Sequence, residues 1–125
     1  MAARPQRVLV GYDGSSGARR ALETAADLVG YGSTLAVVSV GQDAADDPEA
    51  ALEDAREQMR DRRLPATYVL RRGDAVGELV DAARVLGANL LVVGATTQNG
   101  DRRHGLGAVS VDVVRCAPCA VLVVR

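Results

Sequence analysis

A glycine-bearing loop between two apolar runs near the end of the chain has the composition of an anion-binding loop. From Leu90 to Val124 the sequence reads LLVVG, then ATTQNGDRRHGLG, then AVSVDVVRCAP and CAVLVV. Gly94 follows the first apolar run directly, and Gly107 stands just before a predicted short helix. Such a loop brings backbone N–H groups and a helix N-terminus to one place, which suits a phosphate group. Both glycines are also compatible with ordinary termination of a strand and a helix.

Other residues with reactive side chains lie in or near this loop. Arg102, Arg103 and His104 either contact phosphate or form a solvated loop tip. His104 is the single histidine, so a Ser-His-Asp triad would have to use it, and we do not expect a hydrolase. Cys116 and Cys119 have the spacing of a redox pair but follow a helix, whereas redox pairs usually begin one. Two cysteines without further ligands predict no metal site.

Composition limits the classes of protein and partner. A chain of 125 residues predicts one domain, spanning residues 1–125. The net charge of -1 disfavours nucleic acid and membrane surfaces as partners. No apolar run approaches the roughly 20 residues of a membrane span. The first residues show no apolar segment of a signal peptide, so we expect a cytoplasmic protein.

Alternating strands and helices are predicted to position the loop. The expected strands are Arg7–Tyr12, Thr34–Val40, Ala66–Leu70, Leu90–Val93 and Cys119–Val124. The expected helices are Gly17–Val29, Pro48 to about Asp61, Ala75–Leu86 and Ala108–Arg115. The apolar faces of the first and third helices comprise Ala18, Ala21, Leu22, Ala25 and Leu28, and Val76, Leu79, Val80, Ala83 and Leu86.

Turn and cap residues support these boundaries. Asp47-Pro48 suits an N-cap followed by proline at the first helical position, and Gly73-Asp74 suits a turn and a cap. Arg71-Arg72 is expected to end the third strand, which favours an edge position for it. Strands that alternate with helices predict an α/β domain with a doubly wound parallel sheet and helices on both faces. Ligands bind such sheets at the carboxyl ends of strands, where we expect Asp13, Val40 and Gly94.

Three segments of the chain resemble the universal stress protein family. They are VLVGYDGSSGARRALETAADL, GDAVGELVDAARVLGANLLVVG and GAVSVDVVRCAPCAVLVVR, in this order and at the family's spacing. The resemblance implies an adenine-nucleotide alpha-hydrolase-like fold with a five-stranded sheet in the order 3-2-1-4-5. It also implies a homodimer paired through the last strand, at Val121, Leu122, Val123 and Val124. Such pairing would remove an unpaired sheet edge.

One branch of this family binds ATP through a pattern of glycine, two residues, glycine, nine residues, glycine, and then Ser or Thr. The spacing from Gly94 to Gly107 fits this pattern, but Thr97 replaces the second glycine and Ala108 replaces the hydroxyl residue. A positive φ at a non-glycine residue costs roughly 1–2 kcal/mol, and a lost hydrogen bond to phosphate roughly 1.5–3 kcal/mol. Alternatively, Gly100 and the basic loop residues rebuild the phosphate contacts.

The resemblance implies that a base lies beside Asp13 and Val40, although Asp13 could instead cap or shape a turn. The full set of predicted contacts is Gly11, Tyr12, Asp13, Val40, Val93, Gly94, Thr97, Gly107, Ala108, Val109 and Ser110.

The resulting expectation is a dimeric stress-response sensor that binds ATP or another adenine nucleotide, with or without Mg²⁺. It is not expected to be an enzyme beyond slow ATP hydrolysis, because no positioned general base is visible. One alternative is a nucleotide-free interaction module of the same family that works with an unidentified protein partner. Another is a thiol sensor at Cys116 and Cys119.

Overall fold

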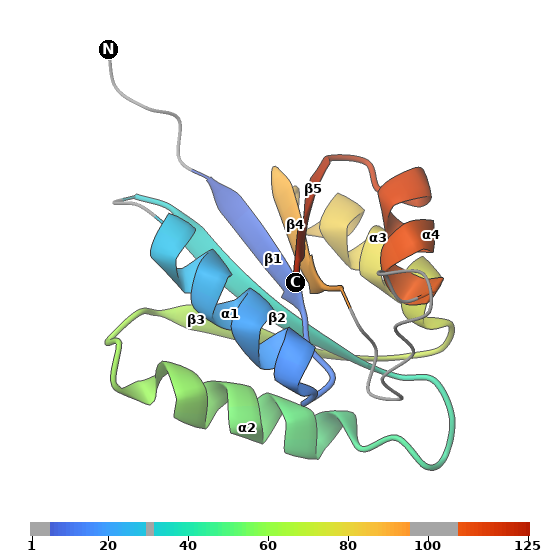
Figure 1. The fold of residues 1–125 in the computed structure, drawn as a ribbon, viewed down its shortest axis with the longest axis horizontal. Helices are drawn as coiled ribbons and strands as arrows, with labels where there is room; N and C mark the ends of the chain where they lie inside the picture. Colours follow the sequence, from blue (N-terminus) through green and yellow to red (C-terminus); the bar gives the residue numbers. More distant parts are fainter. Residues whose placement is uncertain (1–5, 30–31, 96–107) are drawn as a thin grey trace.

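Five parallel strands form one sheet with helices against both faces (Figure 1). The computed structural model describes residues 6–29, 32–95 and 108–125. The strands are β1 (Arg7–Gly11), β2 (Thr34–Gly41), β3 (Ala66–Arg72), β4 (Leu90–Gly94) and β5 (Ala120–Val124). The helices are α1 (Ser16–Leu28), α2 (Pro48–Arg60), α3 (Ala75–Val85) and α4 (Ala108–Cys116). The strand order β3-β2-β1-β4-β5 confirms the predicted topology, including the edge position of β3.

The central strands are buried on both faces because each face carries its own helix layer. Val8 and Val10 of β1 pack with α1 and α2, whereas Leu9 packs on the other face with α3 and α4. This alternation follows from the two-residue period of a strand. Figure 1 shows the same two layers, with α1 and α2 on one side of the sheet and α3 and α4 on the other.

Local side-chain caps set the starts of three helices. The Ser15 hydroxyl accepts from the Ala18 amide at 3.1 Å and begins α1. Asp47 and Asp74 begin α2 and α3 in the same way, as predicted. These side chains satisfy amides that have no partner within the helix. The longest helices have 13 residues, and no helix in the described ranges is long and apolar enough to cross a membrane.

The prediction that two arginines end the third strand is wrong. Arg71 and Arg72 continue β3 and pair in register with Val40 and Gly41 of β2. The strand tolerates these charges because Arg71 Nη1 lies 3.3 Å from Glu78 and 2.9 Å from Asp81, both on α3.

Other boundaries differ by one residue. Tyr12 lies beyond β1, Gly94 belongs to β4, and Cys119 precedes β5. Two predicted core residues are also exposed, Leu28 at 50% and Leu86 at 38%. Both lie at helix C-termini, Leu28 as the last residue of α1 and Leu86 as the C-cap of α3.

Candidate functional site

A pocket lies at the carboxyl ends of β1 and β4, where the strand order changes direction. The chain leaves β1 toward β2 on one side, and β4 occupies the other side of β1. Parallel sheets of this kind bind ligands at such a position. The pocket has a volume of about 110 Å³. Its described lining residues are Gly11, Tyr12, Asp13, Ser15, Ala18, Val38, Val40, Ala75, Leu79, Val93, Gly94, Val109 and Ser110.

The structure brings most of the predicted site residues together in this pocket. Those that line it are Gly11, Tyr12, Asp13, Val40, Val93, Gly94, Val109 and Ser110. Ala108 is the first residue of α4. Thr97 and Gly107, together with the basic tip at residues 102–104, lie outside the described residues.

Sequence reasoning missed five lining residues. They are Ser15, Ala18, Val38, Ala75 and Leu79. Two of them carried a usable signal, because Ala18 and Leu79 stood on predicted apolar helix faces. Leu79 reaches the sheet so closely that an added Cβ on Gly11 would lie 3.2 Å from its methyl groups. The apolar floor of the pocket therefore requires a small residue at position 11.

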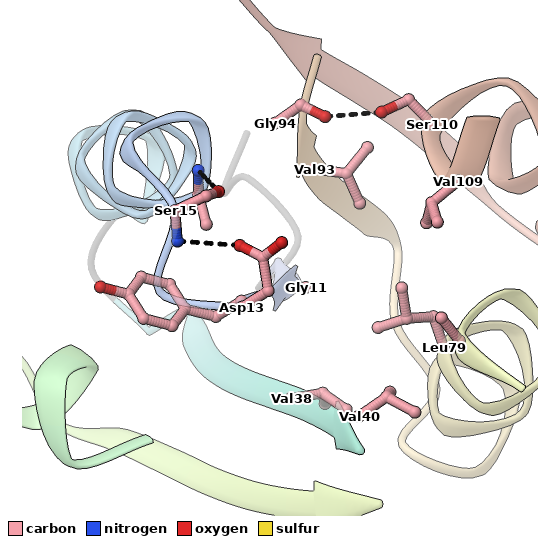
Figure 2. Close-up of a pocket in the computed structure, with 13 residues that line it drawn as sticks. Gly11, Asp13, Ser15, Val38, Val40, Leu79, Val93, Gly94, Val109 and Ser110 are labelled. Carbon is pink, nitrogen blue, oxygen red and sulfur yellow. Dashed lines mark hydrogen bonds between the residues drawn. The ribbon is translucent and has the colours of Figure 1, made fainter. Parts of the chain in front are cut away.

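Acidic and apolar groups occupy different sides of the pocket. Figure 2 shows Asp13 and Ser15 on one side and Leu79, Val93 and Val109 on the other. Asp13 Oδ1 accepts from the Ser15 amide at 2.9 Å, while Ser15 itself caps α1. The interpretation of Asp13 as a helix cap is therefore wrong, and its interpretation as a turn-forming residue is confirmed. Among the described residues only Ser15 donates to this carboxylate, which leaves Oδ2 able to accept from a ligand hydroxyl.

Gly94 is required by packing as well as by any ligand. A Cβ at this position would lie 2.7 Å from the backbone carbonyl carbon of Gly17 and 3.1 Å from the Ala18 nitrogen. The first turn of α1 thus lies directly against the end of β4. The Gly94 carbonyl also accepts a hydrogen bond from the Ser110 hydroxyl at 2.5 Å (Figure 2). Ser110 is buried and already uses its only proton, so its hydroxyl does not replace the one absent at Ala108.

Two helices that begin at the pocket have no acidic residue in their first turn. Neither α1 nor α4 has an acidic residue in its first turn, whereas α2 has Glu49 and α3 has Glu78. An acidic side chain in the first turn would offset the partial positive charge of the helix N-terminus. At α1 the Asp13 carboxylate, which accepts from the Ser15 amide, offsets part of this charge, so the N-terminus of α4 is the end that favours a negatively charged group.

The Tyr12 side chain is hydrogen-bonded to α2. Its hydroxyl donates to Asp54 and lies 3.2 Å from Gln58 Oε1. Burial, and then the hydrogen bond to Asp54, raise the pKa of Tyr12 well above its ordinary value. Arg19 Nη1 contacts both oxygens of Asp54, at 2.8 and 2.7 Å. The hydrogen bond from Tyr12, followed by Arg19, lowers the pKa of Asp54, so this carboxylate is ionised at neutral pH.

A second, polar groove adjoins the pocket and shares Asp13 and Val40 with it. Its volume is about 360 Å³, and it runs between the N-terminal turns of α1 and α2. Arg19 and Asp54 form part of its wall. The two cavities together give a ligand an apolar and a polar compartment on either side of Asp13.

The two cysteines differ in their exposure to solvent. Both thiols are free, Cys116 exposed and Cys119 half-buried. Burial raises the pKa of the Cys119 thiol, whereas a reactive thiolate needs a lowered pKa. The described residues also contain no group of three or more His, Cys, Asp or Glu that could hold a metal ion.

Comparison with known proteins identifies the family. The universal stress protein family profile matches residues 5–125. The chain belongs to this family. A curated relative, the universal stress protein YxiE of Bacillus subtilis, is 32% identical over 74 residues, which cover 59% of this chain. The matched stretch spans 50% of the length of YxiE.

Solved universal stress proteins share the fold over nearly the whole chain. One, determined in complex with cAMP, has a TM-score of 0.80 at 24% identity and covers 98% of this chain and 99% of its own. Another, from Arabidopsis thaliana with AMP bound, has a TM-score of 0.74 at 19% identity and covers 96% and 90%. At these identities the likeness establishes the fold.

Proposed function

We propose that this universal stress protein binds an adenine nucleotide in the pocket at the carboxyl ends of β1 and β4. The observation that supports this most directly is that the N-terminus of α4, whose first turn has no acidic residue, lies at a pocket with a mainly apolar floor and one carboxylate, Asp13. An apolar floor suits a base, and helix N-termini suit phosphates. Relatives of the same fold, determined with cAMP and with AMP, make an adenine nucleotide the natural ligand class.

Each part of the nucleotide would contact a different group of residues at the pocket. The base would lie against Val40, Leu79 and Val93, and a ribose hydroxyl would donate to Asp13. Phosphates would bind the first-turn amides of α4 and the loop that precedes it, with Mg²⁺ neutralising their charge in ATP.

We also propose a binding and sensing role in the cytoplasm, without efficient ATP turnover. The described pocket holds one carboxylate, Asp13, and that group is tied to the Ser15 amide. We propose a homodimer paired through the outer edge of β5, since no strand of the described residues pairs with that edge.

The first experiment is to measure bound and added nucleotide. Denatured, freshly purified protein is analysed by mass spectrometry, and stripped protein is titrated with Mg-ATP, AMP and cAMP by calorimetry. A Thr97→Gly, Ala108→Ser variant should bind Mg-ATP more tightly, by roughly ten- to a hundredfold, because it restores a hydroxyl donor to phosphate. Val40→Phe should abolish binding by filling the pocket, whereas Val111→Phe, on the exposed face of α4, should not.

A nucleotide-free interaction module is the second candidate, and two observations favour it. The Ser110 hydroxyl is used within the protein, and packing alone explains Gly94. Absence of co-purified nucleotide and of binding at millimolar concentrations, with binding gained only in the double variant, would favour this candidate.

A further inference from the structure

Tyr12 lines the pocket together with its neighbours, but its hydroxyl donates to helix α2. Its neighbours Gly11 and Asp13 both line the pocket, and Tyr12 is only 3% exposed. Its backbone amide donates to the Val38 carbonyl at 2.9 Å, which fixes the main chain against β2. Its hydroxyl donates to Asp54, a residue 42 positions further along the chain. The segment that carries Asp13 is therefore anchored at both the main chain and the side chain.

The acceptor of this bond is itself held in place. Arg19 of α1 contacts both oxygens of Asp54, and the Gln58 side-chain amide donates to the Arg19 carbonyl at 2.8 Å. An ionised acceptor makes the hydrogen bond from Tyr12 roughly twice as strong as one between neutral groups. The result is a link that joins α1, α2 and the end of β1 behind the pocket.

We propose that Tyr12 is a positioning residue, whose hydrogen bond to Asp54 holds the Asp13 carboxylate at the base and ribose end of the nucleotide site. This inference rests on the proposed function. Consecutive Cα atoms are 3.8 Å apart, so a displacement of the Tyr12 main chain also displaces the main chain of Asp13. Asp54 also lines the polar groove that meets the pocket at Asp13 and Val40. The position of α2 thereby affects the part of the site that would contact the nucleoside rather than the phosphates.

The test compares Tyr12→Phe and Asp54→Asn with Arg62→Ala. Arg62 follows the end of α2 and also connects this region to α1, with Nη2 2.7 Å from Glu23 and 2.8 Å from Asp27. It is not among the residues that line the pocket. Calorimetry with adenosine and Mg-ATP should show both affinities weakened by a common factor, roughly three to ten, in Tyr12→Phe and Asp54→Asn. The double variant should be no weaker than the worse single variant, and Arg62→Ala should bind like the wild type.

Three binding results would overturn the inference. One is wild-type affinity in Tyr12→Phe, and another is equal weakening in Arg62→Ala, which would mean that general loosening of α2 is responsible. A loss confined to Mg-ATP would overturn it as well, because the nucleoside end would be unaffected.

Hydrogen exchange of the ligand-free protein separates this inference from the proposed function. The Ser15 amide reports directly on Asp13, because it donates to that carboxylate. Its exchange should be faster in Tyr12→Phe than in the wild type and unchanged in Arg62→Ala. If the wild type binds no nucleotide, the proposed function fails, and the exchange rates alone decide whether Tyr12 positions Asp13. Unchanged exchange in Tyr12→Phe would refute the positioning role.

Discussion

Gly94→Ala should destabilise the fold even when no ligand is present. The added Cβ would lie 2.7 and 2.8 Å from the carbonyl carbon and oxygen of Gly17. Both are backbone atoms of the first turn of α1, so relief requires a shift of the helix or the strand. Overpacking of this kind costs about 1–3 kcal/mol, and backbone contacts this short place the change in the upper half of that range. At about 4 °C per kcal/mol for a domain of this size, the melting temperature should fall by roughly 8–12 °C.

Gly11→Ala is the matched control, since it adds the same methyl group at the end of the neighbouring strand. The three atoms nearest to its Cβ would be methyl groups, two of Leu79 at 3.2 Å and one of Val93 at 3.4 Å, and side-chain methyl groups can move. We expect a loss below about 1 kcal/mol for this variant. Urea and thermal unfolding of both ligand-free variants measure the difference. If Gly94→Ala melts within a degree or so of the wild type, or no lower than Gly11→Ala, the close contact between α1 and β4 is refuted.

Three further outcomes follow from described contacts. Ser110→Ala should lower the free energy of unfolding by about 1–2 kcal/mol, because it removes a buried hydrogen bond to β4. Urea titration measures this loss, and an unchanged midpoint would contradict the prediction. The lowered pKa of Asp54 means that its contribution to stability is present above its unfolded-state pKa and is lost as the pH falls through its folded-state pKa. Acid titrations should therefore show a smaller loss of stability in Asp54→Asn than in the wild type. Under native conditions a thiol reagent should modify exposed Cys116 well before Cys119, whose pKa is raised by burial, and equal rates would disprove this order.

Features that depend on neighbouring residues could be predicted from the sequence. The caps Asp47 and Asp74 each bond an amide three residues ahead, so their type and position indicated the helix starts. The topology was equally accessible, because apolar runs and amphipathic stretches alternate along the chain and the strand order was implied by the family resemblance. The position of the pocket then followed from where parallel strands end.

Features that depend on distant contacts could not be predicted. Tyr12 was predicted to contact the nucleotide and does line the pocket, but nothing in the sequence indicated that its hydroxyl donates to Asp54 of α2. Gly94 was read as a ligand residue or a strand terminator, and only packing shows that it meets Gly17 of α1. Arg71 was expected to end β3, but its carboxylate partners on α3 allow the strand to continue. In each case the residue type indicated that the position matters, but the sequence did not indicate which distant residue it contacts.

The two edges of the sheet differ in a way that bears on how copies can add to one another. The outer strand β5 is entirely apolar from Ala120 to Val124. At the opposite edge, β3 ends in Arg71 and Arg72, and the Arg56 guanidinium lies 4.8 Å from the centroid of the Tyr68 ring. Charged side chains along an edge oppose the addition of another strand. If two copies pair through β5 as proposed, each sheet then has only the charged β3 edge left, so the association would end with two copies and would not propagate into a fibre.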